Sequence, residues 1–505
     1  MRLASLVFLP LLAAAAAYAH RSPRFRSAWL LVAAFAHVAL LASLWIVPAG
    51  PAFSGWLAVD ALGLVILTVV SVLFAVVAVY AVGYLGAESP RGGRAFVSCL
   101  LAFLATTSLV ALSHHMALLW VGMEATTLAL APLVYHRHDR RSLEAVWKYL
   151  VLSSVGIALA LLGTFFLAAA QVQGRPLLIE DLMSGAKTLQ PGLLRAAFVF
   201  LLVGFGTKMG LAPLHAWKPD TYGEAPSLVG CLMAGALTSC AFLGLARVAQ
   251  VMTAAGQAAF MQPLLLAFGL FSLLVAAAFM IGQTDLKRLL AYSSVEHMGL
   301  LVLGLGLGGT GVWGTVLHVL NNGLTKGLMF LTVGNIVLVT GTSHAPSMRG
   351  VLRQVPVSGA LLLAGLFAVT GSPPFGLFVS EFTILGAAIG QGHPWIGVST
   401  VVLLAVIFVG MARTILEFLY GEPVGPAPGP REGSLRLSGP ILLALVVLLL
   451  GVYLPLPLRD VLARASRSLG GAVPLPGWRS WASETGARCR WRRCRPSRWS
   501  GSASG

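Results

Sequence analysis

Long apolar runs separated by short polar segments recur along this chain and determine its fold class. A membrane-crossing helix needs about 20 consecutive, mostly apolar residues. Fourteen runs approach or exceed that length, near residues 3–19, 28–49, 57–84, 95–112, 116–135, 147–170, 194–216, 227–249, 259–282, 286–306, 312–340, 356–388, 394–418 and 437–455. The pattern predicts an all-α polytopic membrane protein with about 14 transmembrane helices.

The composition agrees with this pattern and removes several other classes of protein. Apolar residues make up 57% of the chain and charged residues 10%, whereas a soluble protein has about 25% charged residues. A water-soluble enzyme, a disordered chain and a disulfide-rich secreted chain are therefore excluded. No CxxC pair and no Cys/His cluster has the spacing of metal ligands, so we expect no metal and no cofactor to be bound by this chain.

The net charge of +17 suggests nucleic acid at first sight, but the distribution of the charges indicates membrane orientation instead. Sixteen cations follow odd-numbered runs, whereas the loops after even-numbered runs hold only Arg175, Lys187 and Arg195. Because positive charge resists translocation, we expect the sixteen in the cytoplasm and the N-terminus outside. The expected location is a bacterial inner (cytoplasmic) membrane, with the lipid bilayer and no nucleic acid as partner. The sixteen are Arg21, Arg24, Arg26, Arg91, Arg94, Arg137, Arg140, Arg141, Lys148, Lys218, Lys287, Arg288, Arg349, Arg353, Arg431 and Arg436.

The two ends of the chain each allow more than one interpretation. Arg2, an apolar core and the segment Ala17–Ala19 also fit a signal peptide, but we favour a retained helix because many spans follow. Residues 459–498 hold ten arginines that the fourteenth helix would deliver outside. Three explanations stay open: a span count that is wrong by one, a tail that is not part of the natural fold, and a tail that binds anionic lipid.

Several apolar runs keep an ionisable residue, although a charge in hydrocarbon is costly and such residues usually face a partner, a cavity or an ion path. Glu124 lies in the middle of MALLWVGMEATTLALAPLVY, and Lys208 lies far from both ends of its run. Burial and a nearby cation shift the pKa of a carboxyl group in opposite directions, so such a pair can titrate near neutral pH. We interpret Glu124 as a proton-binding carboxylate with Lys208 as its partner. The less favoured alternatives are a structural acid for Glu124 and, for Lys208, a lysine that snorkels to the membrane surface.

A second group of ionisable residues occupies the later runs. Lys326 lies eight residues after His318 in an otherwise apolar run, and histidine can carry protons near pH 7. Glu296 and His297 lie about two turns into their run; they are candidates for the same path, although an interfacial position is the alternative. His215 and Lys218 adjoin the end of the seventh run and are expected to line an entrance.

Two runs are interrupted by glycine and proline beside an ionisable residue. The segment GFGTKMGLAP contains Lys208, and GSPPFG precedes Glu381. Broken helices occur within the bilayer where backbone lines a cavity, and two of them five spans apart are typical of inverted repeats. We therefore expect three N-terminal helices in 1–94, five-helix repeats in 95–250 and 251–420, a last helix in 421–456 and a basic tail, possibly non-native, in 457–505.

Four segments carry a resemblance to a known family: GTKMGLAPLHAWKPDTYGEAPS, QTDLKRLLAYSSVEHMG, LNNGLTKGLMFL and GSPPFGLFVSEFTIL. Together they resemble the antiporter-like proton-conducting subunits of respiratory complex I and group 4 hydrogenases, over roughly residues 95–420. The segment from Met348 to Phe382 is most similar to the hydrogenase-4 component F type. The resemblance implies fourteen helices with two inverted five-helix repeats and broken helices 7 and 12.

The resemblance also implies roles for individual residues. Glu124 matches the glutamate of the family's fifth helix, Lys208 the lysine of the seventh, Lys326 a lysine of the eleventh, and Glu381 the residue that ends the relay in the twelfth. The chain departs from the family in the eighth helix, where MAGALTSCAFLG has no lysine, and at Lys218, where an apolar residue is usual. A continuous lysine relay is therefore in question, with water or His318 as the expected bridge.

These features favour one function and leave two alternatives. The favoured function is that of a proton-translocating, non-redox membrane subunit of a redox-driven complex. That complex would be a membrane-bound hydrogenase of the formate hydrogenlyase kind or an NADH-quinone oxidoreductase, with other membrane and peripheral subunits as partners. The first alternative is a subunit of a multi-subunit cation/proton antiporter, in which Thr207, Ser372, Ser380 and Glu381 would hold sodium. The second is an inactive membrane scaffold, which the missing lysine supports.

Overall fold

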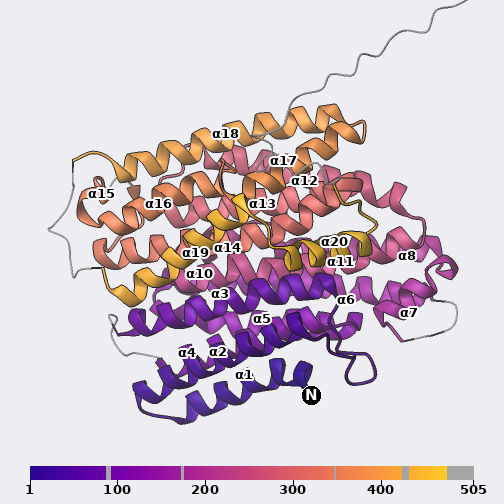
Figure 1. Ribbon diagram of the computed structural model, residues 1–505, viewed down its shortest axis with the longest axis horizontal. Helices are drawn as coiled ribbons and strands as arrows, with labels where there is room; N and C mark the ends of the chain where they lie inside the picture. Colours follow the sequence, from indigo (N-terminus) through magenta and orange to yellow (C-terminus); the bar gives the residue numbers. More distant parts are fainter. Residues whose placement is uncertain (87–92, 172–173, 175, 346–347, 423–431, 475–505) are drawn as a thin grey trace, which may run out of the picture. The chain divides into compact units, whose positions relative to one another are not determined.

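The computed structural model describes residues 1–86, 93–171, 174, 176–345, 348–422 and 432–474, and these are helical along most of their length (Figure 1). Thirteen helical segments in this part of the chain are long and apolar enough to cross a membrane. They are α1 (Arg2–Ala19), α2 (Pro23–Ile46), α3 (Ala61–Leu85), α4 (Gly93–Leu112), α5 (Met116–Val134), α6 (Arg140–Ala169), α8 (Pro191–Met209), α10 to α11 (Ser227–Ala254), α12 (Ala258–Met280), α13 (Leu286–Leu307), α14 (Gly309–Thr340), α18 (Pro394–Leu419) and α19 (Ser434–Val452).

Two shorter apolar helices, α16 (Pro356–Val369) and α17 (Gly376–Gly390), follow each other and supply the remaining span. The expected all-α fold with about 14 spans is therefore confirmed, and the chain is an integral membrane protein. Where the structure describes the connecting segments, they hold only short elements: Tyr135–Arg137, α7 (Ile179–Ser184), Ala186–Thr188, α9 (Trp217–Glu224) and α15 (Val351–Gln354).

The seventh and twelfth spans are each built from two helices joined by an irregular segment, as their glycine and proline content predicts. α8 ends at Met209 and is followed by Gly210, which has a φ of 75°, and α9 starts at Trp217. α16 ends shortly before Gly371, which has a φ of 61°, and α17 starts at Gly376. Glycine occupies this left-handed region without the steric cost that a Cβ brings, and the prolines in both segments cannot donate a helical hydrogen bond.

The helices repeat one pattern of neighbours in two consecutive five-span units. In the first unit α4 packs on α5, α5 on α6, and α6 on α8 of the broken span. In the second unit α12 packs on α13, α13 on α14, and α14 on α16 and α17 of the other broken span. Since five is an odd number of crossings, the second unit enters the membrane from the opposite side. The two broken spans therefore hold equivalent places in two inverted repeats.

The eighth span contains a π-helical turn, Met233–Leu237, between α10 (Ser227–Leu232) and α11 (Thr238–Ala254). Such turns inside α-helices are frequent at functional sites. The Thr238 hydroxyl donates to Ala234 O at 2.6 Å, and the Ser239 hydroxyl donates to Gly235 O at 2.6 Å. Both hydroxyls are thus bound within their own helix, in the span where the family resemblance leads us to expect a lysine.

The segment after the last span begins with an amphipathic helix, α20 (Leu456–Ser468). Val461, Leu462 and Ala465 are buried on its apolar face, where it packs against α3 and α14, while Arg464 and Arg467 are exposed. The compact unit of the spans extends to Val473 and includes α20, so the first part of the expected basic tail, 457–505, packs with the spans, and the expected division into repeats and tail stays a prediction. The rest of the expected tail, from residue 475, lies outside the described residues.

Candidate functional site

The first polar cluster lies where α5, α6 and α8 meet. Lys208, the penultimate residue of α8, is fully buried; its Nζ donates to Thr127 Oγ1 at 2.5 Å and to the Tyr149 hydroxyl at 3.2 Å. Thr127 in turn donates to Glu124 Oε2 at 3.4 Å. The hydroxyl of Thr127 therefore links the carboxylate and the ammonium that the sequence predicts to be partners.

The local sequence explains why these groups converge. Glu124 and Thr127 are three residues apart on α5, a spacing that places both on one face of a helix. The ring of Tyr149 lies with its centroid 5.0 Å from Lys208 Nζ, within the range of about 6 Å for a cation–π contact. Two hydroxyls and an aromatic face thus replace part of the hydration that Lys208 loses on burial.

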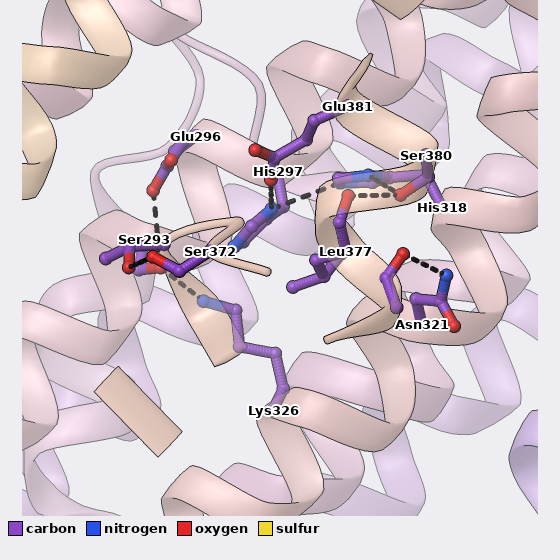
Figure 2. Close-up of polar contacts among 12 residues, drawn as sticks. Ser293, Glu296, His297, His318, Asn321, Lys326, Ser372, Leu377, Ser380 and Glu381 are labelled. Carbon is purple, nitrogen blue, oxygen red and sulfur yellow. Dashed lines mark hydrogen bonds and ion pairs between the residues drawn. The ribbon is translucent and has the colours of Figure 1, made fainter. Parts of the chain in front are cut away.

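A second cluster repeats this arrangement in the second five-helix unit. Lys326 on α14 is fully buried, and its Nζ donates to Ser293 Oγ on α13 at 2.5 Å (Figure 2). Ser293 donates to Glu296 Oε2 at 3.3 Å. In both units, then, a lysine and a glutamate are joined through a hydroxyl that lies three residues from the glutamate. The carboxylate that the structure brings closest to Lys326 in this chain of contacts is Glu296.

A third cluster joins α13, α14 and α17. His297 Nδ1 lies 3.1 Å from His318 Nε2 and 4.0 Å from Glu381 Oε1, and His318 Nδ1 lies 2.9 Å from Ser380 Oγ (Figure 2). Because Ser380 donates its hydroxyl hydrogen to Leu377 O, it accepts from Nδ1–H of His318. A neutral His318 then offers Nε2 as the acceptor for His297 Nδ1–H. Each hydrogen bond from His297 through His318 and Ser380 to Leu377 O therefore has a defined donor and acceptor.

The same three ionisable groups are the one candidate for a metal site among the described residues. His297, His318 and Glu381 each offer a ligand atom, and these atoms lie within 4.8 Å of one another. However, Lys326 acts electrostatically on all three groups, and its ammonium form repels a metal cation. The existing hydrogen bond between the two imidazoles also occupies both facing nitrogen atoms. The geometry therefore favours a site for protons over a site for a metal.

Lys218, expected at an entrance, is fully buried on α9, which packs between α6 and α13. Its Nζ donates to Ser294 Oγ at 2.9 Å. The segment HAWKPD resembles a polar loop in sequence, but Lys218 and both of its neighbours in the chain are buried. Lys218 is therefore not a solvated loop cation, and an entrance role for it stays a prediction. His215 is half-buried, with its ring 6.3 Å from the rings of Phe279 and Tyr292, and an entrance role for it stays a prediction.

A cavity of about 530 Å³ with a charged lining lies beside the far end of α9. Asp220 projects into it and pairs with Lys148 at 2.7 Å and Arg288 at 3.1 Å. Glu144 and Glu224 contribute further carboxylates. All five belong to segments that the charge distribution places on the cytoplasmic side. Because its lining is polar, this cavity is suited to hold water through which protons reach α9.

On the opposite side, an ion pair joins the start of α3 to α11. Arg247, 1% exposed, donates from Nη1 and Nη2 to the two carboxylate oxygens of Asp60 at 2.6 and 2.7 Å. Burial is the largest single influence and opposes ionisation of Asp60, but the charge and hydrogen bonds of Arg247, with His114 and the Gly63 N–H, together hold the pKa of Asp60 well below its ordinary value. His114 is buried beside this pair, and burial and then Arg247 lower the pKa of His114. The segment after α4 is therefore less solvated than a loop at a membrane surface.

The charged members of these clusters can be identified from the sequence, whereas the hydroxyl groups between them cannot. Thr127, Tyr149, Ser293 and Ser294 are unremarkable in an apolar run, because serine and threonine also occur in spans as packing residues. The available signal was the spacing of three residues in Glu124–Thr127 and in Ser293–Glu296. That spacing becomes informative only when a lysine on another helix is known to face it.

Comparison with known proteins identifies the family. A family model described as "NADH:quinone oxidoreductase/Mrp antiporter, TM" matches residues 113–407. The chain belongs to this family. The matched range of the NADH:quinone oxidoreductase/Mrp antiporter family contains every member of the three clusters described above. The resemblance drawn from the sequence motifs is therefore confirmed.

Individual relatives support the same assignment. The chain is 34% identical over 380 residues to the hydrogenase-4 component F homolog of Methylacidiphilum infernorum, covering 74% of this chain and 78% of that protein. It is 30% identical over 427 residues to NADH-quinone oxidoreductase subunit N of Desulforudis audaxviator, covering 79% and 82%. A chain of the membrane-bound sulfane sulfur reductase, an archaeal respiratory membrane complex, has the same fold, with a TM-score of 0.85, 22% identity and coverage of 93% and 98%.

Proposed function

We propose that this chain is a proton-translocating membrane subunit of a redox-driven complex of the membrane-bound hydrogenase or NADH-quinone oxidoreductase kind. The observation that carries the proposal is the repeated arrangement of a buried lysine, a bridging hydroxyl and a glutamate, once in each inverted unit beside a broken span. Other membrane and peripheral subunits would hold the redox cofactors. The relatives named as component F and subunit N support an assembly of this type.

The mechanism follows from how the lysines are held. Thr127 transmits the position of Glu124 to Lys208, so a small shift of α5 against α8 changes the interaction between carboxylate and ammonium. One pKa unit corresponds to about 1.4 kcal/mol, and a modest change of separation in a low-dielectric interior supplies that energy. A neighbouring subunit that moves α5 during redox turnover would therefore cause Lys208 to bind and release a proton. The proton then moves through Lys326 and the histidine pair toward Glu381.

The test is proton uptake by inverted membrane vesicles that contain the assembled complex, with formate or NADH supplied as electron donor and redox turnover recorded in parallel. We expect Lys208→Ala to abolish uptake while the complex stays assembled. Lys187→Ala, which changes an exposed lysine, is the matched control and should pump normally. Unchanged uptake in Lys208→Ala would make the lysine structural and would favour an inactive scaffold.

One observation keeps a cation/proton antiporter as a second candidate. Glu381 Oε1 is buried without a hydrogen-bond partner among the described residues, and the Ser380 hydroxyl lies in the same helix. Carboxylate and hydroxyl oxygens are suitable ligands for a hard cation such as sodium. The hydroxyls of Thr207 and Ser380 each donate to a carbonyl of their own helix, Val203 O at 2.7 Å and Leu377 O at 2.9 Å, and keep oxygen lone pairs for a cation. Sodium-dependent proton exchange without any electron donor would support this candidate.

A further inference from the structure

The two lysine clusters lack a connection at the position where the family resemblance leads us to expect one. The eighth span, which lies between the clusters in the sequence, carries no lysine, and the hydroxyls of Thr238 and Ser239 are bound to carbonyls of their own helix. A proton that reaches Lys208 therefore needs another titratable group before Lys326. Among the described residues, Lys218 is a fully buried lysine that the proposed mechanism does not use.

Lys218 contacts the break that follows Lys208 on one side and a hydroxyl next to the second cluster on the other. On one side its stem and amine pack directly on Gly210, so closely that a Cβ at that position would overlap the side chain. Gly210 is two residues from Lys208 in the same break. On the other side Lys218 Nζ donates to Ser294 Oγ at 2.9 Å, and the adjacent Ser293 accepts from Lys326. Two neighbouring hydroxyls of α13 thus bind the amines of two different lysines.

The second broken span also has an ionisable side chain packed on the positive-φ glycine of its break. There the Glu381 carboxylate packs on Gly371, and a Cβ at that glycine would overlap it. In both inverted units, an ionisable side chain from the second half-helix folds back onto the positive-φ glycine of its own break. The position of Lys218 is therefore a feature of the repeat and the counterpart of Glu381.

We propose that Lys218 carries protons between Lys208 and Lys326 and so closes the gap left by the eighth span. The Lys208 ammonium releases a proton to the neutral Lys218 amine, and the resulting ammonium passes one through the Ser294 and Ser293 hydroxyls to the neutral Lys326 amine. Each hydroxyl takes up one proton and releases one, so charge and atoms balance. Because like charges repel strongly in a low-dielectric interior, a proton arriving at one amine promotes release from the next. The inference rests on the proposed function.

The test compares substitutions at Lys218 in the same vesicle assay, with uptake expressed per assembled complex. Lys218→Met keeps the length of the stem and removes the amine, which donates to Ser294. We expect proton uptake to fall to below about a tenth of the wild-type rate, as for other losses of a positioned proton carrier. Lys187→Met is the control and should pump at the wild-type rate.

Lys218→Arg separates proton exchange from a fixed positive charge. The guanidinium stays protonated under all conditions in a protein, so a carrier role predicts the same loss as Lys218→Met. Wild-type pumping in Lys218→Arg would overturn the carrier role and leave a structural cation. If Lys218→Met fails to assemble, the proton uptake of Lys218→Arg alone decides between the two roles.

Lys208→Ala in the same series distinguishes failure of this inference from failure of the proposed function. Loss of uptake in Lys208→Ala with normal uptake in Lys218→Met would overturn the role of Lys218 alone. Normal uptake in both variants would overturn the proposed function, and the inference with it. Loss of uptake in Lys208→Ala, Lys218→Met and Lys218→Arg would support both.

Discussion

At the scale of single residues, the hydroxyl groups decide how the charged groups communicate. A lysine and a glutamate in direct contact would form an ion pair that holds its proton firmly. Here Thr127 stands between Glu124 and Lys208, and Ser293 stands between Glu296 and Lys326. A hydroxyl can accept from one group while donating to the other, so it transmits a change in charge without fixing the partners together.

Replacement of Thr127 by valine tests this role. The two side chains have the same shape, so Thr127→Val removes the hydroxyl with little change in packing. A hydrogen bond to a charged group is worth about 1.5–3 kcal/mol, and we expect proton uptake per turnover to fall roughly tenfold or more. Thr126→Val is the matched control, since the Thr126 hydroxyl donates to Met123 O of its own helix. Equal uptake in the two variants would remove Thr127 from the path.

At the scale of helices, the sequence allows the spans and their breaks to be predicted but not every boundary. GFGTKMGLAP and GSPPFG predict broken spans because glycine and proline interrupt a helix whatever surrounds them. The position of Lys218 after the seventh apolar run indicates a loop cation at an entrance, and only the packing of α9 between α6 and α13 shows that it is buried. The same holds for α20, whose arginines suggest a tail while its apolar face packs on α3 and α14.

The bond between Asp60 and Arg247 joins α3 to α11, and its loss should destabilise the protein. In Asp60→Asn the buried guanidinium remains without a counter-charge; removal of one partner of a fully buried pair costs about 3 kcal/mol, and because the Asp60 side chain is 29% exposed, we expect a smaller cost here. Thermal unfolding in detergent, followed by tryptophan fluorescence at pH 7, should show a lower Tm. Asp460→Asn, an exposed carboxylate on α20, is the control and should leave the Tm unchanged.

The effect of Asp60→Asn should depend on pH in one direction. The folded state holds the pKa of Asp60 below its ordinary value, so the ion pair contributes in full above about pH 4. As the pH falls below that value, the wild type loses this contribution and the difference in Tm between wild type and Asp60→Asn should shrink. A difference that stays constant from pH 7 to pH 3 would contradict the charge-based explanation.

At the scale of the whole molecule, the contacts agree with the orientation expected from the charges. Asp60, His114 and Arg247 lie in or beside segments that follow even-numbered spans, and the structure brings them together. Asp220 and Arg288 lie in or beside segments that follow odd-numbered spans, and they pair in the charged cavity. Each group is consistent with one side of the membrane, so the alternation of sides along the chain agrees with the packing.

The absolute orientation can be measured by cysteine labelling. Ser184→Cys lies in the segment after the sixth span and Arg353→Cys after the eleventh, and both positions are exposed. In intact cells, with Cys489 and Cys494 replaced by serine, we expect a membrane-impermeant maleimide to label Ser184→Cys. Arg353→Cys should be labelled only after the membrane is opened. The reverse pattern would invert the assignment of the charged cavity to the cytoplasm.

The π turn at Met233–Leu237 determines in which direction the side chains of α11 point around the helix axis. Each residue of an α-helix advances the side-chain direction by about 100°, and a π turn accommodates one extra residue. If a single residue were deleted there and the turn reverted to an ordinary α-helix, Arg247 would point to a different sector, away from Asp60. Gln250, which donates to Ser468 on α20 at 3.0 Å, would turn with it. One irregular turn in the middle of the eighth span thus determines how α11 docks on α3 and α20 at the end of that span.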